Sequence, residues 1–165
     1  MPLEPAVRIE VARPEDVDNL LRIEEECSAH PWTRDHMVRA VGDPTGGANV
    51  LVLREGGGLG ITGFCAIQVV LDELHVHNLA VRPPARRRGH ARRLLMAGFE
   101  EGVRRGARRA FLEVRAGNHA ALALYRSCGL IPVGLRRAYY REPEEDAVLL
   151  ERPELSVPTD PLRSR

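Results

Sequence analysis

The 165-residue chain contains no lysine, and all 24 of its basic residues are arginine. Aromatic residues make up only 4% of the chain, and no segment approaches the roughly 20 consecutive apolar residues that a membrane-spanning helix requires. The first ten residues have neither a basic segment nor an apolar core that would direct export. The sequence therefore predicts a cytoplasmic protein with no membrane partner. The missing lysine is interpreted as a compositional bias, because arginine can replace lysine at most surface positions.

Cysteine is also sparse, and its spacing fits neither of its usual structural roles. Cys27, Cys65 and Cys128 are odd in number, far apart, and free of any Cys-x-x-Cys or Cys/His finger pattern. A disulfide framework and a structural zinc site are therefore both unexpected, and the three thiols are predicted to be reduced. His75 and His77 would share one face of a strand, but no third ligand lies nearby in the sequence, so no metal is expected.

Charge of one sign is not in excess, since the formal net charge is only +1. A protein held on nucleic acid mainly by bulk charge is usually strongly basic, so no direct nucleic-acid partner is expected. The arginines are nevertheless clustered, with five of them between residues 86 and 93. Acidic runs at 24–26 and 144–146 balance this cluster.

The chain length suits a single domain that buries most of its apolar surface without disulfides or metals. Apolar periodicity and turn residues divide it into strands and helices. The expected elements are a strand over 7–12, a helix from Pro14 through Ile23, a helix over 34–41 with Thr33 as its N-cap, strands over 48–54, 61–71 and 73–81, a helix over 89–105, a strand over 110–114, a helix over 118–128, and strands over 133–140 and 147–151. The run over 110–114 is almost uninterrupted in apolar residues, which predicts a central strand covered on both faces. Residues 153–165 contain three prolines and little apolar content, which predicts a disordered tail after a domain over 7–152.

Two glycine-containing segments could in principle bind phosphate, but their contexts differ. Residues 56–60 lead into a strand rather than a helix, which predicts a hairpin turn instead of a phosphate loop. Residues 81–95 form a strand end, a basic turn and a helix start. Backbone N–H groups at a helix N-terminus are unpaired and partially positive, and Gly89 and Ala91 are small enough to let a pyrophosphate approach them. The residues alone fit an anion site and a solvated helix start equally well.

The spacing of this turn, Arg86-x-x-Gly89-x-Ala91 after a strand, resembles the (Gln/Arg)-x-x-Gly-x-(Gly/Ala) signature with which GNAT acetyltransferases hold acetyl-CoA. Residues 112–118 (LEVRAGN) and 123–130 (ALYRSCGL) resemble the RimI-type ribosomal-protein-alanine acetyltransferases of that superfamily. The likeness covers about residues 7–152. It implies a single GNAT-fold domain of class α/β (α+β), with a mixed, mostly antiparallel central sheet flanked by helices.

The resemblance also implies an enzyme that uses acetyl-CoA as cosubstrate and no metal. Its implied acceptor is a protein N-terminal α-amine, in particular the N-terminal alanine of a small-subunit ribosomal protein. The implied cofactor-binding residues are Leu79, Ala80 and Val81 through their backbone, Arg87, Arg88, Gly89, His90, Ala91 and Arg92, which form the pyrophosphate turn mainly through main-chain N–H groups, and Asn118. From its position alone Asn118 predicts a helix N-cap, a role that is compatible with cofactor contact.

Glu113 stands out because a carboxylate in an apolar strand is costly to bury without a partner, water or a proton. An outward-facing glutamate at a strand end is the other interpretation of the same residue. The resemblance implies that Glu113 is the general base. An α-amine has a pKa near ~8, so a correctly placed base needs little strength to deprotonate it at neutral pH.

Tyr125 falls in the last turn of the helix expected after Glu113, where position alone predicts a core aromatic with its hydroxyl at the surface. The resemblance implies that it is the general acid, which protonates the departing CoA thiolate. A tyrosine, with a pKa near ~10, can give a proton to the conjugate base of a thiol whose pKa is near ~8.5.

Several alternatives stay open. The same chemistry could serve a small-molecule amine or other protein N-termini, and Tyr139 and Tyr140 are expected to line the acceptor groove in any case. A non-catalytic acetyl-CoA-binding or ribosome-docking module would use the arginine cluster, but the presence of both Glu113 and Tyr125 favours an enzyme. An acyl-cysteine route through Cys128 is disfavoured because a cysteine beside a helix-ending glycine usually serves packing.

Overall fold

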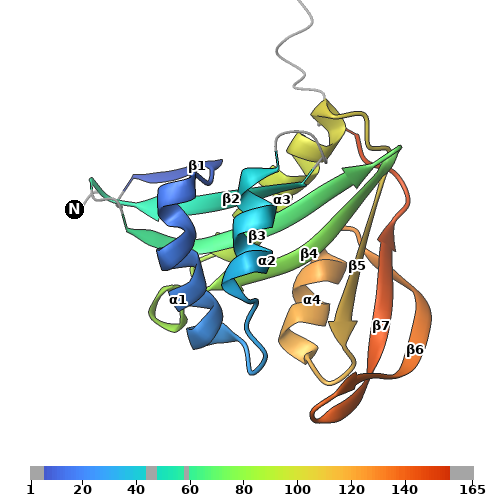
Figure 1. Cartoon of the computed structure of the whole chain (residues 1–165). Helices are drawn as coiled ribbons and strands as arrows, with labels where there is room; N and C mark the ends of the chain where they lie inside the picture. The colour runs from blue at the N-terminus through green and yellow to red at the C-terminus, as the bar shows by residue number, and fades with distance from the viewer. Residues whose placement is uncertain (1–5, 44–47, 58–59, 157–165) are drawn as a thin grey trace, which may run out of the picture.

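The computed structural model of the chain describes residues 6–43, 48–57 and 60–156 (Figure 1). The strands are β1 (Val7–Val11), β2 (Ala48–Glu55), β3 (Ile61–Val70), β4 (Glu73–Val81), β5 (Arg109–Arg115), β6 (Ile131–Arg141) and β7 (Glu144–Arg152). The helices are α1 (Val17–Cys27), α2 (Arg34–Gly42), α3 (His90–Arg104) and α4 (His119–Ser127), with short 3-10 turns η1 (Pro14–Asp16) and η2 (Pro83–Ala85). Within the described residues the strands form one sheet in the order β1-β2-β3-β4-β5-β7-β6, and only β4 and β5 pair in parallel. The expected α/β (α+β) class with a mixed, mostly antiparallel sheet is confirmed.

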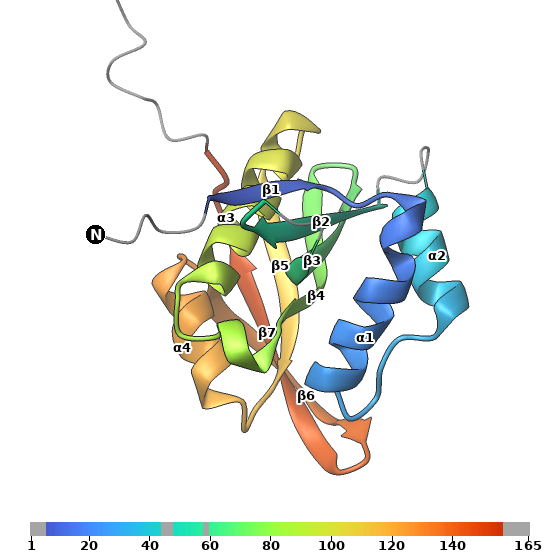
Figure 2. The same cartoon turned by 90° about the vertical axis from the view of Figure 1, so that its left-hand side faces the viewer.

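The helices lie in two layers, one on each face of the sheet (Figure 2). On one face α1 packs against β3 and β4, and α2 packs against β2. On the other face α3 packs against β2, β3 and β4. The strands supply both layers by alternation: Val50 and Val52 belong to the core under α1 and α2, whereas Leu51 and Leu53 belong to the core under α3. Strands β2 to β4 are therefore covered on both faces, and we call them the covered half.

Beyond β4, strands β5 and β7 bury one face only and β6 is exposed along nearly its whole length, and we call these three strands the open half. Ala110, Leu112 and Val114 of β5 are buried in the core that α3 and α4 share. Phe111 and Glu113 point to the opposite face and are half-buried. The expectation that this strand is covered on both faces is therefore wrong. The reason is that α1 and α2 pack on β2 to β4, and their core includes no residue of β5.

Local chemistry sets several of the predicted helix ends. Thr33 Oγ1 accepts a hydrogen bond from the His36 N–H at 3.2 Å and caps α2. Asn118 Oδ1 accepts from the Ala121 N–H at 3.2 Å and caps α4 in the same way. Gly129, with φ +85°, follows α4 in the left-handed conformation that a glycine adopts without steric cost. Both predicted N-caps are confirmed.

The loops and the C-terminal end follow the sequence less closely. Strands β2 and β3 pair antiparallel with Arg54 opposite Ile61, which confirms the hairpin, although Gly58 and Leu59 lie outside the described residues. Most of the expected disordered tail, residues 157–165, also lies outside them. At the start of that tail, the Leu155 N–H donates to the Arg108 carbonyl at 2.7 Å and its side chain packs on the core. None of the helices in the described part of the chain is long and apolar enough to cross a bilayer.

Candidate active site

The site begins where two neighbouring strands separate. β4 and β5 pair only over Glu73–Val76 and Arg109–Leu112. Beyond these residues β4 continues alongside β3, and β5 continues alongside β7. Ala66 pairs with Asn78 while Ile67 pairs with Val76, so His77 is the extra residue of a β-bulge where the strands begin to part. We call residues 77–81 of β4 and 113–115 of β5 the strand gap.

A cleft of about 340 Å³ runs through the strand gap, and we call it the through-sheet cleft. Residues from both helix layers line it: Glu24 and Cys27 of α1 on one side, and Asn118 and Tyr125 at α4 on the other. Of the predicted site residues, the cleft brings together Glu113, Tyr125, Asn118, Leu79 and Ala80. Val81 and the turn over 87–92 are not part of its lining.

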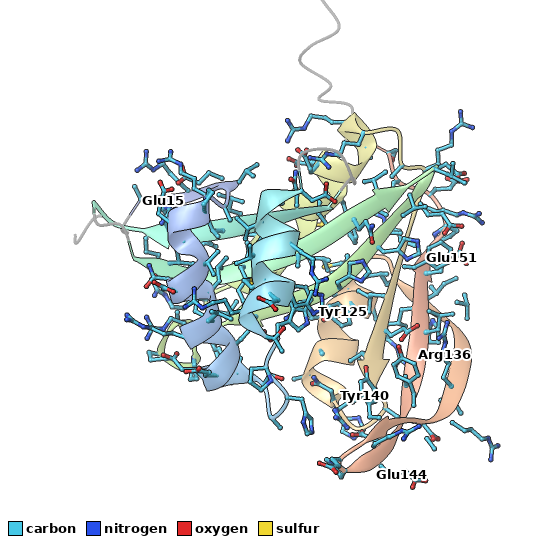
Figure 3. All side chains as sticks on the ribbon, in the orientation of Figure 1. Glu15, Tyr125, Arg136, Tyr140, Glu144 and Glu151 are labelled. Carbon is cyan, nitrogen blue, oxygen red and sulfur yellow. The ribbon has the colours of Figure 1, made fainter. Side chains whose placement is uncertain are left out.

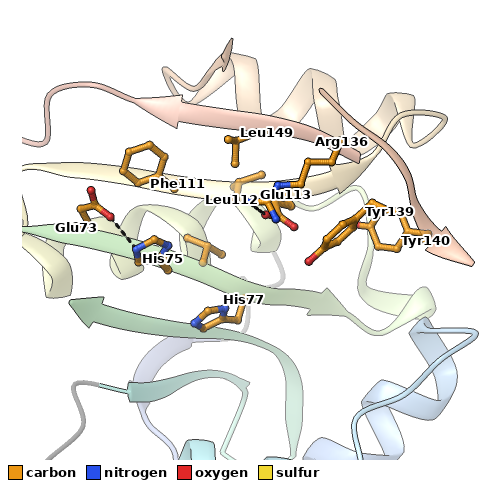
Figure 4. A pocket seen from close by; sticks show the side chains of 11 residues that line it. Glu73, His75, His77, Phe111, Leu112, Glu113, Arg136, Tyr139, Tyr140 and Leu149 are labelled. Atoms are coloured by element: carbon orange, nitrogen blue, oxygen red, sulfur yellow. Dashed lines mark hydrogen bonds and ion pairs between the residues drawn. The ribbon is translucent and has the colours of Figure 1, made fainter. Parts of the chain in front are cut away.

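A second hollow, of about 610 Å³, lies on the uncovered face of the open half, and we call it the open groove. Figure 4 shows its floor on β4 and β5 and its wall on β6. Tyr139 and Tyr140 both line it, as the sequence predicted for the acceptor side. The Arg115 guanidinium lies 4.1 Å from the centre of the Tyr140 ring and holds that ring against β5.

Glu113 lies at the border between these two spaces. Five of the described residues line both spaces: Val76, His77, Leu112, Glu113 and Tyr140. Glu113 is the one carboxylate among these five shared residues. A group bound in the through-sheet cleft and a group bound in the open groove would therefore meet beside this side chain.

The Glu113 side chain is 25% exposed and is not the unpaired buried carboxylate that the sequence suggested. Its Oε1 lies 3.3 Å from a terminal nitrogen of Arg136, which reaches across from β6 (Figure 4). It also interacts with the Tyr139 hydroxyl: a hydrogen bond to Glu113, and then its negative charge, raise the pKa of Tyr139. Glu113 is thus held from two sides by partners on β6.

Tyr125 approaches the same region from α4 (Figure 3). This helix lies on the face of the sheet opposite α1 and α2 (Figure 2), and so opposite the open groove. Its ring packs on the core shared by α3 and α4, and its side chain is half-buried. Burial raises the pKa of Tyr125 above its ordinary value of 10.0, so its hydroxyl keeps its proton at every physiological pH. Such a residue can donate a proton and, at the same time, serve as a core aromatic.

The turn before α3 presents its backbone rather than its side chains. Gly89 precedes the helix with φ +78°, and no atom lies within 4 Å of where a Cβ would stand. The first-turn N–H groups of His90, Ala91 and Arg92 have no partner within the helix, as at any helix start. Arg86 folds back, and its Nε donates to the Val81 carbonyl at 2.9 Å. It therefore braces the turn against the end of β4.

Three residues of this turn, which was predicted to bind the cofactor mainly through main-chain N–H groups, have side chains engaged within the protein. Arg88 and His90 both contact Glu55 of β2, at 2.5 and 3.1 Å, and His90 is only 4% exposed. Arg92 donates to Ser127 Oγ at 2.9 Å and so connects α3 to the end of α4. Arg87 differs from these three, because it is exposed and takes a positive φ of 65°.

Two residues at the site had not been singled out from the sequence. Glu24 is 2% exposed and accepts hydrogen bonds from Asn78 Nδ2 at 2.7 Å and from the Trp32 N–H at 3.0 Å, which fastens the α1–α2 connection to β4. Its spacing of four residues from the buried Leu20 could have placed it on the inner face of α1. Arg136 lies on an exposed strand, where no sequence pattern distinguishes one arginine from its neighbours.

The histidines of β4 bind side chains of the protein. His75 Nε2 lies 3.1 Å from Glu73 Oε2, and His77 Nε2 lies 3.0 Å from Gln68 Oε1. Among residues 6–43, 48–57 and 60–156, no group of three or more His, Cys, Asp or Glu side chains is arranged to hold a metal ion.

Comparison with known proteins places this geometry in a family. The model of the Acetyltransferase (GNAT) family matches residues 17–130. A putative ribosomal protein bS18-alanine N-acetyltransferase of Bacillus subtilis is 34% identical over 138 residues, which are 84% of this chain and 89% of that protein. The bS18-alanine N-acetyltransferase of Escherichia coli K12 is 35% identical over 140 residues, 84% of this chain and 91% of its own. The crystal structure of the ribosomal-protein-S18-alanine N-acetyltransferase from Escherichia coli has a TM-score of 0.82 and 31% identity, and the match covers 94% of this chain and 98% of that one. The chain therefore belongs to the GNAT family of acetyltransferases.

Proposed function

We propose that this protein transfers the acetyl group of acetyl-CoA to a protein N-terminal α-amine, and that the N-terminal alanine of ribosomal protein bS18 is its acceptor. The observation that carries the proposal is the position of Glu113, which borders both the through-sheet cleft and the open groove. The acceptor is inferred from two relatives that this chain matches over most of their length, the bS18-alanine N-acetyltransferase of Escherichia coli and a putative one of Bacillus subtilis. A ribosomal acceptor would put the enzyme at work in the cytoplasm.

The residues around the strand gap fit acetyl-CoA. Leu79, Ala80 and Val81 lie on the stretch of β4 that no longer pairs with β5, so their backbone can pair with an extended ligand. The turn over 87–92 offers main-chain N–H groups at a helix N-terminus, a suitable partner for a pyrophosphate. Asn118 lines the cleft while it caps α4. Acetyl-CoA supplies the acetyl group as a reactive thioester.

In this proposal Glu113 is the general base. A protein α-amine has a pKa near ~8 and is mostly protonated at pH 7, so one proton must leave before the nitrogen can attack. Glu113 faces the open groove and can accept that proton directly. Position matters more than basicity here, because an ammonium with a pKa near ~8 gives up its proton readily close to neutral pH.

Tyr125 is the general acid in the same proposal. It lines the through-sheet cleft from α4, and its raised pKa keeps the hydroxyl protonated. A thiol, with a pKa near ~8.5, is a stronger acid than this tyrosine, so the hydroxyl gives its proton to the sulfur only as the C–S bond breaks, and the phenolate left behind regains a proton from solvent. Glu113 thus takes the proton that the amine loses, and Tyr125 supplies the proton that the departing sulfur gains.

The shape of the acceptor side favours a polypeptide over a small amine. The open groove continues toward a further hollow of about 480 Å³, which lies between the α1–α2 connection and the β6–β7 hairpin. His30 Nε2 hydrogen-bonds the Glu142 carbonyl across that hollow. An extended chain could lie along both hollows, whereas a small amine would fill only a fraction of the first. A ribosome-docking patch of arginines is disfavoured, because the side chains of Arg86, Arg88 and Arg92 are bonded within the protein.

A peptide panel tests the acceptor. Hexapeptides that differ only in their first residue, Ala, Ser, Gly or Met, are compared with simple alkylamines at saturating acetyl-CoA. We expect the alanine peptide to give the highest kcat/KM, and the alkylamines to be poorer by at least about 100-fold because they cannot use the length of the groove. Comparable rates for a small amine would overturn the proposed acceptor and leave the acetyl-CoA chemistry intact.

Calorimetry tests the cofactor site separately. Arg87→Gln should weaken acetyl-CoA binding about tenfold, as expected when one charge-assisted contact to a phosphate is lost. Arg104→Gln is the matched control, because Arg104 is an exposed arginine at the far end of α3, roughly 20 Å along the helix. Equal affinities for the two variants would remove Arg87 from the site. If acetyl-CoA at 100 times its Kd gave the wild-type protein no thermal stabilisation, the cofactor assignment itself would fall.

A further inference from the structure

The ion pair between Glu113 and Arg136 raises a question about the acceptor. Arg136 lies on β6, and its terminal nitrogen is 3.3 Å from Glu113 Oε1. Arg136 lines the open groove but not the through-sheet cleft. The guanidinium therefore stands on the side of Glu113 from which an acceptor amine must arrive, where the incoming ammonium needs the same carboxylate.

The ion pair between Glu113 and Arg136 can be broken at little cost, so another cation can take the place of Arg136. The Arg136 side chain is 54% exposed, and ion pairs this exposed to solvent contribute little to stability. β6 is an edge strand that pairs with β7 alone, and its register with β7 shifts directly after Arg136. The guanidinium also lies 5.5 Å from the centre of the Tyr139 ring, so it can keep a cation–π contact with this ring when it leaves Glu113.

Arg136 is the cation that faces Glu113 at neutral pH. On β4, His77 interacts with the negative charge of Glu113, which raises its pKa. Partial burial, and then His75 and His36, outweigh this effect, so the pKa of His77 is lowered. From β5 itself, Arg115 pairs instead with Glu145 at 3.3 Å. Tyr139 and Tyr140 of β6 are neutral, and their pKa values are raised.

We propose that Arg136 is a positioning residue for the acceptor. It holds Glu113 in place until the acceptor ammonium replaces it, and its guanidinium then donates to the carbonyl oxygen of the acceptor's first residue. The inference rests on the proposed function and deepens it, because it makes the site selective for an amine that is followed by a peptide carbonyl.

Covalent geometry supports this second role. The amine nitrogen and the carbonyl oxygen of one residue are only three bonds apart, so a group beside the carboxylate that pairs with the amine is also within reach of the carbonyl. A guanidinium carries five N–H donors in a planar fork and no acceptor, so it can move from a carboxylate to a carbonyl without losing its function as a donor. An amine without a carbonyl offers it no new partner.

The test couples a protein change to a substrate change. Two alanine-first hexapeptides are used, one natural and one in which a trans alkene replaces the first amide and so removes the carbonyl oxygen. Wild-type protein, Arg136→Gln and Arg137→Gln are compared with both peptides. Arg137→Gln is the matched control, because Arg137 is the next residue on the same exposed strand and does not line the open groove.

For the wild-type protein we expect the alkene to raise the acceptor KM about tenfold, the lower end for loss of a charge-assisted hydrogen bond. Arg136→Gln should raise the KM of the natural peptide by about the same factor, leave kcat and acetyl-CoA affinity nearly unchanged, and no longer distinguish the two peptides. Arg137→Gln should behave as wild type. The alkene removes an amide N–H as well as the carbonyl oxygen, and this second loss is the same for all three proteins. The contribution of Arg136 is therefore measured by comparing the alkene-to-natural KM ratio of Arg136→Gln with that of the wild-type protein.

The outcomes separate the two claims. If Arg136→Gln discriminates between the peptides as well as wild type does, Arg136 makes no contact with the carbonyl and the inference is wrong. If the wild-type protein acetylates both peptides with equal KM, the inference fails while the proposed function stands. If it acetylates neither peptide but does acetylate an alkylamine, the proposed function fails and takes the inference with it.

Discussion

The covered half and the open half of the sheet share one hydrogen-bonded ladder but use it differently. In the covered half, both faces of β2 to β4 are packed under helices. In the open half, one face of β5 is packed, and β6 is exposed along nearly its whole length. The residues proposed to hold acetyl-CoA lie at the edge of the covered half, whereas the groove proposed for the acceptor belongs to the open half. The comparison suggests that one half supplies rigidity and the other supplies access.

The largest difference between the two halves should be in the free energy of unfolding that is lost when a leucine is truncated. Leu74→Ala removes a fully buried side chain under α3 and should cost about 2 to 5 kcal/mol of unfolding free energy. Leu135→Ala makes the same deletion on β6, where the side chain is 54% exposed, and should change the stability by no more than about 0.5 kcal/mol. Chemical denaturation of both variants measures the difference. Equal losses would mean that β6 is covered in solution and that the halves do not differ as described.

Catalysis should depend most on Glu113, the residue that the through-sheet cleft and the open groove share. Glu113→Gln keeps the volume of the side chain but removes the base, so kcat should fall about 100-fold at neutral pH, the lower end for general-base assistance. The loss should shrink as the pH rises toward ~8, because the acceptor amine then arrives deprotonated. Glu25→Gln, on the exposed side of α1, is the control. A variant with wild-type activity at pH 7 and a wild-type profile up to pH 9 would make Glu113 a structural carboxylate.

Loss of the hydroxyl should affect different kinetic parameters at Tyr125 and at Tyr139. Tyr125→Phe removes a proton donor from the through-sheet cleft, so kcat should fall about tenfold while acetyl-CoA affinity stays within about twofold. Tyr139→Phe removes only a hydrogen bond to Glu113 in the open groove and should change the acceptor KM by a few-fold at most. Steady-state kinetics on both variants makes the comparison. If CoA is released as fast by Tyr125→Phe as by wild type, Tyr125 is a core aromatic and the acid lies elsewhere.

The smallest expected effect is a plateau at high pH. General-acid catalysis needs the protonated form of Tyr125, and a raised pKa extends that form to higher pH, above the ordinary 10.0. At saturating substrates, kcat should therefore show no alkaline decline between pH 8 and about pH 10. Activity measured across this range checks the expectation. A decline below pH 10 that disappears in Tyr125→Phe would show that the hydroxyl titrates normally and is not buried as described.

Sequence reasoning succeeded where the cause was local. Thr33 and Asn118 were identified as helix caps because a cap depends on the few residues around it. It failed for β5, whose apolar run suggested cover on both faces. That cover depends on how far α1 and α2 extend across the sheet, and no short segment of sequence encodes it.

The candidate site shows the same limit. Glu113 was selected as a carboxylate in an apolar strand, but its partner Arg136 comes from β6, more than 20 residues later. Arg88 and His90 were expected at the phosphate turn mainly through their main-chain N–H groups, and the partner of their side chains, Glu55 of β2, was not predicted. In each case the residue types could be read from the sequence, while the pairing depended on register and topology.

The strand gap also has an engineering consequence. A sheet whose β4 and β5 stayed paired to their ends would gain several backbone hydrogen bonds, each worth a net ~0.5 to 1.5 kcal/mol, and would lose its passage. The fold therefore gives up some stability to keep these strands apart. Anyone who seeks a thermostable version should look for gains on the outer helices and in the loops, and should leave residues 77–81 and 113–115 alone. Substitutions that draw those two segments together would yield a more stable protein without acetyltransferase activity.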